Sequence, residues 1–124
     1  MADTDIEIDE TADLIASSKV EGTAVYDRNG DRLGTVNNFM VDKASGQVEY
    51  VVLSIGGLFG LGTEYFPLPW DRLAYAEDLD GYQVDLLKED LEEAPHYSAE
   101  QEPAFNRAYG EQIDTFYDRD FEAA

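Results

Sequence analysis

The side chain that most invites a catalytic interpretation is His96, the single histidine of this 124-residue chain. A Ser-His-Asp triad would place it beside a serine on a strained turn, and the sequence contains no Gly-x-Ser-x-Gly motif of the kind that forms such a turn. We therefore interpret His96 as an ordinary surface or packing histidine. Since no nucleophile, base and orienting group can be assembled from the sequence, we expect the protein not to be an enzyme.

A spacing typical of calcium loops occurs at Asp27, Asn29 and Asp31, which stand in the first, third and fifth places. Such a loop also needs glycine in the sixth place and glutamate in the twelfth. Here Gly30 falls in the fourth place, and Asn38, in the twelfth, has no carboxylate to bind the ion. We expect a hairpin turn instead, because Asn-Gly pairs adopt the positive φ that tight hairpins require. A zinc site would need several histidine or cysteine ligands, so we expect no metal and no cofactor.

The glycine-rich residues 56–62 (Gly-Gly-Leu-Phe-Gly-Leu-Gly) share only their composition with a phosphate-binding loop. No Gly-Lys-Ser/Thr follows them, and strands are expected on both sides where a phosphate loop needs a strand and a helix. Their large apolar side chains either fold back and plug one end of the protein or form a contact surface. We predict a partner-binding surface from this loop and the aromatic strand after it: Leu58, Phe59, Leu61, Phe66 and Trp70.

The net charge limits the classes of partner. The chain has 28 acidic and 8 basic residues and a net charge of −20, which opposes binding to nucleic acids and to anionic membranes. Two explanations of the acidity remain open: a solubility adaptation, for example to a salty habitat, and a surface complementary to a basic partner. The hydrophobic content of 44% suits one folded domain, and the absence of cysteine excludes disulfides and thiolate metal sites.

Three parts are expected along the chain. Residues 1–17 are predicted to form a flexible acidic tail, residues 18–95 a β domain, and residues 96–124 an acidic helical extension. The first residues are acidic where a signal peptide needs basic ones, and no apolar run is long enough to span a membrane. We therefore expect a cytoplasmic protein without membrane insertion.

The middle part alternates strand-forming runs with turn sequences at regular spacing. The turns are expected at residues 27–31, 44–46 and 78–81, where Asn, Asp, Ser and Gly are concentrated. Six strands are expected around them: residues 19–26, 32–42, 47–55, 64–69, 73–76 and 82–87. Short strands joined by tight turns indicate an antiparallel barrel or sandwich, and a small closed barrel fits a segment of about 70 residues.

The apolar pattern indicates which strands are covered. Every second residue from Tyr82 to Leu86 is apolar, which is typical of a strand with one buried face. Residues 50–53 (Tyr-Val-Val-Leu) are apolar on both faces and predict a central strand with an outer cover. Val36 and Phe39 break the two-residue period, so we expect a bulge that turns both side chains inward and helps the sheet to curl.

Two helical segments are expected after the strands. Residues 88–94 predict a short helix that Pro95 ends. From Pro103 onward, apolar residues recur every three or four positions and predict an amphipathic helix with one stripe: Phe105, Tyr109, Ile113 and Phe116. Gly110 inside this helix costs about 1 kcal/mol of helix stability. The stripe either covers the central strand or faces a partner.

Several segments in a fixed order carry a family resemblance: residues 14–23, 25–27, 30–34, 46–52, 56–62 and 66–71. The last of them reads Phe-Pro-Leu-Pro-Trp-Asp, and residues 46–52 read Gly-Gln-Val-Glu-Tyr-Val-Val. Taken together, the pattern over residues 14–95 resembles the PRC-barrel family, in particular its stand-alone bacterial members. The resemblance implies a six-stranded antiparallel barrel, similar to the cytoplasmic domain of the photosynthetic reaction-centre H subunit and to the C-terminal domain of the ribosome-maturation factor.

The resemblance also implies an assembly or regulatory module, and the family offers no shared catalytic residues to carry over. The sequence shows neither the transmembrane helix of the H subunit nor the domain that precedes the barrel in the ribosome factor, so neither specific role is expected. We expect a non-catalytic protein-binding module that also self-associates as a two-fold homodimer. The alternative is a regulatory barrel that senses a small molecule or an ion at the glycine-rich loop or the barrel mouth.

Overall fold

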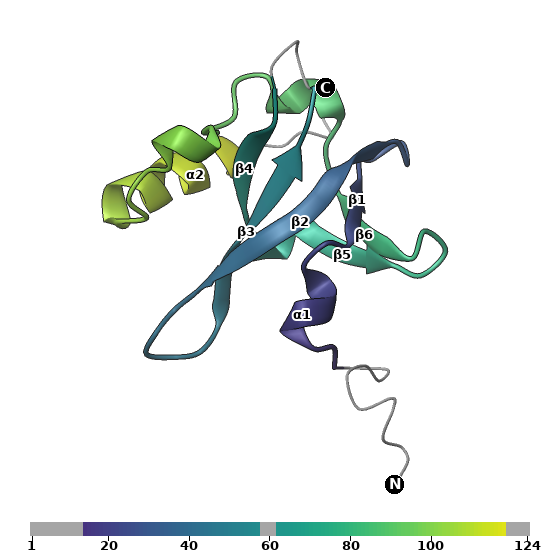
Figure 1. Ribbon diagram of the computed structural model, residues 1–124, viewed down its shortest axis with the longest axis horizontal. Helices are drawn as coiled ribbons and strands as arrows, with labels where there is room; N and C mark the ends of the chain where they lie inside the picture. Colours follow the sequence, from purple (N-terminus) through teal and green to yellow (C-terminus); the bar gives the residue numbers. More distant parts are fainter. Residues whose placement is uncertain (1–13, 58–61, 119–124) are drawn as a thin grey trace, which may run out of the picture.

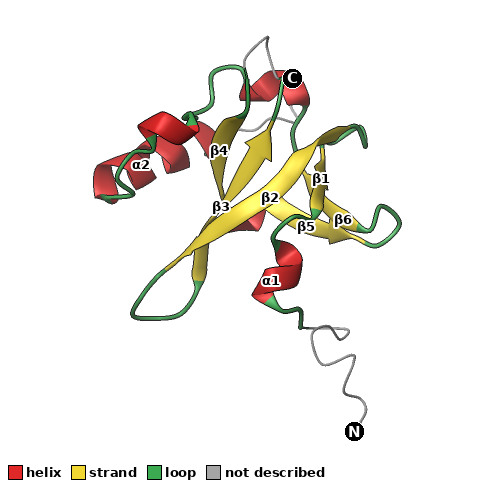
Figure 2. Ribbon diagram, viewed as in Figure 1, coloured by secondary structure: helices red, strands yellow, loops and turns green. Residues whose placement is uncertain are grey.

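The computed structural model describes residues 14–57 and 62–118 as a strongly twisted sheet with a helix against one flank (Figures 1 and 2). The sheet has six strands in these residues: β1 (Ala24–Tyr26), β2 (Arg32–Val41), β3 (Val48–Ile55), β4 (Glu64–Pro69), β5 (Leu73–Ala76) and β6 (Gly81–Val84). The helical elements of the same residues are α1 (Ser17–Val20), α2 (Arg107–Tyr117) and three short 3₁₀ helices: η3 (Trp70–Arg72), η4 (Lys88–Leu91) and η5 (Ala99–Gln101). The expectation of a mainly β protein with a C-terminal helix is confirmed.

The sheet is mixed, and within the described residues hydrogen bonds do not close it, so the expected fully antiparallel closed barrel is wrong in both respects. The strand order is β4-β3-β2-β1-β6-β5. Strands β1 and β6 pair in parallel, and the other neighbours pair antiparallel. The connection between β4 and β5 explains this arrangement. Because η3 turns a corner without reversing the chain, β5 runs in the same direction as β4. Strand β6 is antiparallel to β5 and therefore runs parallel to β1.

The first expected strand, at residues 19–26, begins later than predicted. The chain forms the helical turn α1 up to Val20, whose side chain is buried in the core. Gly22 then takes a φ of +89°, a left-handed conformation that glycine adopts without steric cost. The regular strand pairing begins at β1, which pairs with β2 and β6, although Gly22 and Thr23 already exchange backbone hydrogen bonds with Val36. A single buried valine suits a helical turn as well as a strand, so the apolar pattern does not separate the two.

Strand β2 carries the expected bulge. Its register against β3 shifts between Val36 and Asn38, which leaves one extra residue in β2. Val36 is 1% exposed, and Phe39 packs against the same core. The bulge therefore turns both side chains inward as predicted, and the added twist helps the sheet to curl around its core.

The turn between β1 and β2 is held by the carboxylate of Asp27, which is 2% exposed. Its Oδ1 accepts hydrogen bonds from the backbone N–H groups of Asn29 and Asp31, both at 2.9 Å. Gly30 takes a φ of +88° at the tip of the turn. This geometry confirms the expected hairpin turn, because the carboxylate is satisfied by the backbone of its own turn.

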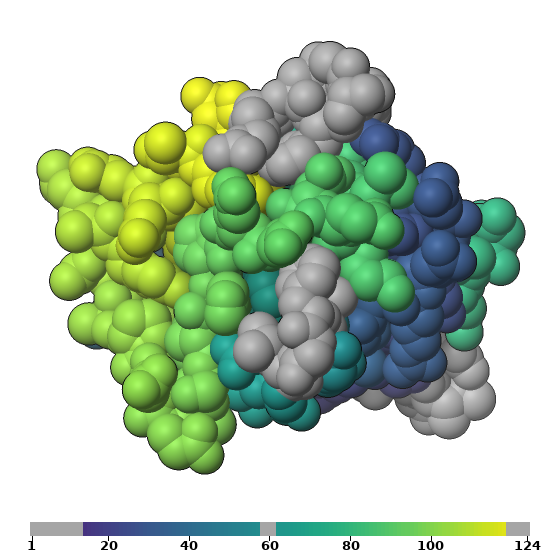
Figure 3. Space-filling view, turned by 90° about the horizontal axis from the view of Figure 1, so that it is seen from above, coloured from purple at the N-terminus to yellow at the C-terminus, as the bar shows by residue number. Residues whose placement is uncertain are grey.

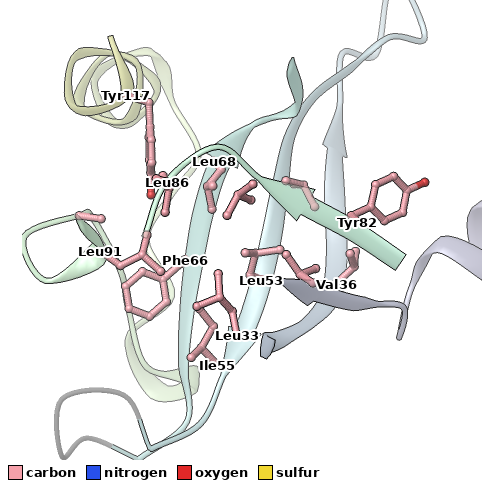
Figure 4. Packing of buried hydrophobic residues seen from close by; sticks show 14 of the residues in the cluster. Leu33, Val36, Leu53, Ile55, Phe66, Leu68, Tyr82, Leu86, Leu91 and Tyr117 are labelled. Atoms are coloured by element: carbon pink, nitrogen blue, oxygen red, sulfur yellow. The ribbon is translucent and has the colours of Figure 1, made fainter. Parts of the chain in front are cut away.

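One face of the curled sheet points into a common apolar core (Figure 4). On β3, the side chains of Val51, Leu53 and Ile55 point there and are at most 1% exposed. Tyr82 and Leu86 are buried in the same core, which confirms the alternation expected around β6. Figure 4 also shows the ring of Tyr117, from α2, pointing toward Leu86. The last turn of α2 thus contributes to the core of the sheet.

The C-terminal part covers the opposite face of β3. Val52, which points to that face, is fully buried. The hydroxyl of Tyr50 donates to the carboxylate of Asp114 at 3.2 Å and lies 3.4 Å from the carbonyl oxygen of Gly110. A Cβ at position 110 would come within 2.9 Å of that hydroxyl oxygen, so the glycine allows α2 to approach this closely. Of the two alternatives for the apolar stripe, the structure therefore supports the cover.

The chain before α2 extends this cover to the outer edge of β4. Tyr97 and Tyr65 exchange two backbone hydrogen bonds of 2.8 and 3.0 Å, and their rings stack at 5.6 Å. Phe105 then contacts the rings of Tyr97 and Tyr109 edge-on, at 6.3 and 5.1 Å. In Figure 3 the segments before α2 and α2 itself lie together on one side of the molecule. Within the described part of the extension, Tyr97, Phe105 and Tyr109 thus pack against other parts of the chain or each other.

The two helical segments differ in detail from their prediction. The segment at 88–94 contains only the 3₁₀ helix η4. Helix α2 begins after Asn106, whose side-chain oxygen accepts a hydrogen bond from the N–H of Tyr109 at 3.0 Å, while Pro103 lies in the preceding loop. Asparagine is among the preferred residues for this capping position. In the part of the chain that the structure describes, no helix is both long and apolar enough to cross a membrane.

Candidate protein-contact surface

The structure places the predicted partner-binding residues in three different settings. Leu58, Phe59 and Leu61 lie outside the described residues. Phe66 is 1% exposed and belongs to the core, so its side chain does not lie on the surface that the sequence predicted for it. Its position in β4 explains this, because it pairs with Leu53 and points to the core face. Trp70 is half-buried in η3, at the corner between β4 and β5.

Trp70 belongs to a row of four aromatic rings, which we call the aromatic row: Phe39, Trp70, Tyr82 and Tyr75. The indole meets Phe39 edge-on at 6.2 Å and Tyr82 edge-on at 5.9 Å. Tyr82 in turn meets Tyr75 edge-on at 5.4 Å. Edge-to-face contacts of this kind add about 0.5–1.5 kcal/mol beyond the burial of apolar area. The rings are therefore held in place by one another before any partner binds.

The aromatic row runs from the core to the surface. Tyr82 is 7% exposed, whereas Tyr75 is 45% exposed and is one of the few large apolar side chains that the described residues expose. The two tyrosines face each other across the β5–β6 pair, and directly opposite residues share one face of a sheet. The hydroxyl of Tyr75 lies 3.2 Å from Oδ1 of Asp80, in the turn after β5. The exposed end of the aromatic row thus lies on β5, the last strand in the order of the sheet, and is held in place by these contacts.

A hollow of about 280 Å³ lies next to Trp70, and we call it the tryptophan hollow. Four of its lining residues are apolar or aromatic and three are acidic: Val48, Tyr50, Pro69, Trp70, Glu49, Asp71 and Asp114. The three carboxylate residues are exposed. Burial, together with the negative charges of Asp114 and Glu49, raises the pKa of Tyr50 to about 12. The hollow therefore combines aromatic walls with a negative potential.

Arg72 lies beyond the tryptophan hollow and joins the sheet to α2. Its guanidinium forms an ion pair of 2.8 Å with Asp85 and donates a hydrogen bond to the carbonyl oxygen of Tyr117, in the last turn of α2. The C-terminal end of a helix carries partial negative charge, so a cation there stabilises the helix. Arg72 thus holds the C-terminal cover against the corner at η3. A second hollow, of about 430 Å³, lies around this contact.

His96 packs within the chain. Its ring stacks on that of Phe66 at 5.0 Å, and Nδ1 lies 2.8 Å from Oε1 of Glu64. The residue is exposed, and these contacts support its interpretation as an ordinary surface or packing histidine. The described residues contain no group of three or more His, Cys, Asp or Glu side chains that could hold a metal ion.

Comparison with known proteins identifies the family. The family model described as PRC-barrel domain matches residues 12–91, which is more than half of the chain. This chain belongs to the PRC-barrel family. It is 30% identical over 80 residues to an uncharacterized protein of Deinococcus radiodurans, an alignment that covers 64% of this chain and 28% of that relative. The chain thus aligns with less than a third of the relative's length.

The family match includes the candidate surface but not most of the C-terminal segment that covers the other face of the sheet. All four members of the aromatic row lie within the matched residues 12–91, whereas α2 and the segment with Tyr97 lie beyond them. The tryptophan hollow joins the two parts, because Asp114 comes from α2 and its other lining residues come from the matched PRC barrel. The hollow is therefore a composite of the family domain and the extension of this particular chain.

Sequence reasoning found Trp70 but missed its neighbours. Phe39 was expected to point inward, and Tyr75 lay in an expected strand, yet neither was assigned to a surface. Their association depends on the mixed pairing of β1 with β6, which brings β5 and β6 round to η3. The available signal was the alternation of large apolar and small residues at positions 73–76 (Leu-Ala-Tyr-Ala), which places the larger side chains on one face of a short strand.

Proposed function

We propose that this PRC-barrel chain is a non-catalytic protein-binding module and that the aromatic row is its contact surface. The observation that carries the proposal is the half-buried Trp70 in edge-to-face contact with rings that lead to the exposed Tyr75. Aromatic side chains are enriched at the centres of protein interfaces because they bury a large area. The rings of this row are already ordered by their contacts with one another, so covering them with a partner costs little side-chain conformational entropy.

Self-association is the second part of the proposal, and the position of β5 supports it. This strand ends the sheet, and end strands offer backbone groups to a further strand. Two copies that meet along β5 around a two-fold axis would bring both Tyr75 rings into one interface. The turn after β5 contains Glu77, Asp78 and Asp80, so the two copies repel each other electrostatically. Self-association should therefore strengthen as salt screens this repulsion.

Site-specific photocrosslinking tests protein binding at the aromatic row. A photoreactive phenylalanine analogue replaces Tyr75 in one variant and Glu111, an exposed residue of α2, in a control variant. On the proposal, position 75 crosslinks to a discrete partner in cells and position 111 does not. Equal products at both positions would refute a contact surface at the row. A small molecule retained in native mass spectra, without any crosslink at position 75, would favour the sensing alternative.

Sedimentation analysis tests self-association separately. The wild-type chain should form a dimer at moderate salt, and Tyr75→Asp should reduce it to a monomer. Ala99→Asp adds the same charge at an exposed position of η5 and should leave the dimer intact. A wild-type chain that stays monomeric at high concentration and moderate salt would remove self-association and leave binding to a different protein. Loss of the dimer in both variants would attribute the effect to net charge.

A further inference from the structure

The tryptophan hollow has walls suited to a positively charged side chain. Trp70 and Tyr50 supply aromatic surface, and aromatic faces attract cations, tryptophan most strongly. Glu49, Asp71 and Asp114 supply carboxylates around the same space. At about 280 Å³ the hollow lies just below the range of about 300–1,000 Å³ that is usual for small-molecule pockets. Its size therefore suits one side chain better than a larger free ligand.

The negative charge of the hollow is not neutralised by its own lining. Among the described residues that line it, none is basic. Arg72 follows Asp71 in the chain, but its guanidinium is engaged by Asp85 and by the carbonyl oxygen of Tyr117. The hydroxyl of Tyr50 donates to Asp114, which leaves that residue with its full negative charge. The surrounding protein, at a net charge of −20, adds to the attraction for a cation.

We propose that the tryptophan hollow receives an arginine side chain from a basic segment of a polypeptide partner. A planar guanidinium stacks on aromatic faces and donates several hydrogen bonds to carboxylates at the same time, which an ammonium group does less well. The proposal rests on the proposed protein-binding function, since Trp70 belongs both to the aromatic row and to the hollow. It adds the chemistry of the partner, which charge complementarity supplies.

The fluorescence of Trp70 gives a direct readout, because Trp70 is the only tryptophan of the chain. The full chain is titrated with a short capped peptide of alternating arginine and glycine at moderate salt. The matched control peptide carries citrulline, which has nearly the shape of arginine without its charge, and a second peptide carries lysine. The expected result is a saturable change in Trp70 emission with the arginine peptide, weaker binding of the lysine peptide, and no response to the citrulline peptide.

Paired variants separate the hollow from general electrostatics. Glu49→Gln with Asp71→Asn removes two charges from the hollow, and Glu92→Gln with Glu100→Gln removes two exposed charges that do not line it. The first pair should weaken binding of the arginine peptide by roughly fivefold or more, as expected for the loss of two exposed charge pairs. The second pair should change the affinity by less than about twofold, because neither residue lines the hollow and salt screens exposed charges outside it.

Each outcome either supports or overturns the proposal. Equal weakening by both pairs of variants, equal binding of the citrulline peptide, or tighter binding of the free polyamine spermidine would overturn the arginine site. So would a saturated peptide complex with unchanged Trp70 emission. Failure here is separable from failure of the proposed function. If position 75 still crosslinks to a protein, only the arginine site is lost; if the peptide binds at Trp70 but position 75 captures nothing, only the aromatic row is lost as a contact surface.

Discussion

The backbones of β2 and β3 leave no room for a side chain at Gly34, so adding a single methyl group there should severely lower the stability of the protein. A Cβ built at this position would lie 2.1 Å from the backbone carbonyl oxygen of Ser54, in the neighbouring strand β3. To reach the 3.0 Å below which such contacts are essentially absent, β2 and β3 must separate by roughly 0.9 Å. The atoms that this Cβ would meet belong to the backbone of Ser54 and Ile55 and not to a flexible side chain, so the backbone itself has to move. Gly34→Ala should therefore destabilise the protein strongly.

The magnitude follows from two contributions. Overpacking of this kind typically costs about 1–3 kcal/mol. Displacement of the strands also weakens the neighbouring β2–β3 ladder, and each backbone hydrogen bond contributes about 0.5–1.5 kcal/mol net. The reduced entropy of the unfolded alanine chain returns about 0.4–1 kcal/mol. We expect a net loss of about 1–4 kcal/mol, centred near 2 kcal/mol, from a domain whose total stability is of the order of 5–15 kcal/mol.

Urea unfolding at moderate salt measures this loss. With a slope of about 1–3 kcal/mol per molar, the midpoint of Gly34→Ala should fall by about 1–2 M. The matched control is Gly62→Ala, because a Cβ at Gly62 would meet nothing within 4 Å. That variant should unfold close to the wild type or slightly later. If both variants shared one midpoint, the strands β2 and β3 would not approach each other as described, and the reasoning from this contact would be refuted.

Three further predictions concern the turn, the tyrosines and the charge. Asp27→Ala should lower the free energy of unfolding by about 1–3 kcal/mol, because two backbone N–H groups lose their acceptor, whereas Asp42→Ala, in a similar but exposed turn, should lower it less in the same urea assay. Burial raises the pKa of Tyr50 and of Tyr97 to about 12, above the ordinary value of 10.0. Their contribution to stability is therefore complete below pH 10 and is lost as the pH rises through about 12. The melting temperature should fall in that range while the absorbance of tyrosinate appears. Ionisation of these two tyrosines at the ordinary pKa, without loss of stability, would contradict this. The net charge of −20 predicts that the melting temperature rises from low to moderate salt, and a flat or falling curve in calorimetry would contradict self-repulsion.

The sequence predicted most of the local structure because local chemistry determines it. The Asn-Gly pair required a turn of positive φ, and Gly30 supplies it at +88°. The broken period at Val36 and Phe39 required a bulge, and the register shift lies there. The alternation from Tyr82 to Leu86 required one buried face. In each case the signal and the structure it determines lie within a few residues of each other, so no long-range information was needed.

The errors of the sequence analysis concern long-range pairing. No local pattern specifies whether β6 runs parallel or antiparallel to β1, because the direction depends on how η3 turns the chain. The burial of Phe66 likewise follows from its register against Leu53, and a one-residue shift would place it on the other face. Trp70 was found by its residue type alone. The carboxylates around it come from β3, η3 and α2, and sequence separation conceals their association.

The two aromatic surfaces of the molecule differ in exposure, and this difference supports the proposed contact at Tyr75. The outer face around Tyr65 is filled by Tyr97, whose segment pairs with the edge of β4 and leads to α2. That cover follows the matched PRC-barrel residues, so the chain itself occupies this face. Tyr75, in contrast, remains 45% exposed at the opposite end of the strand order. Because large exposed apolar side chains tend to mark contacts, the greater exposure of Tyr75 favours this surface over the one around Tyr65 as the proposed contact.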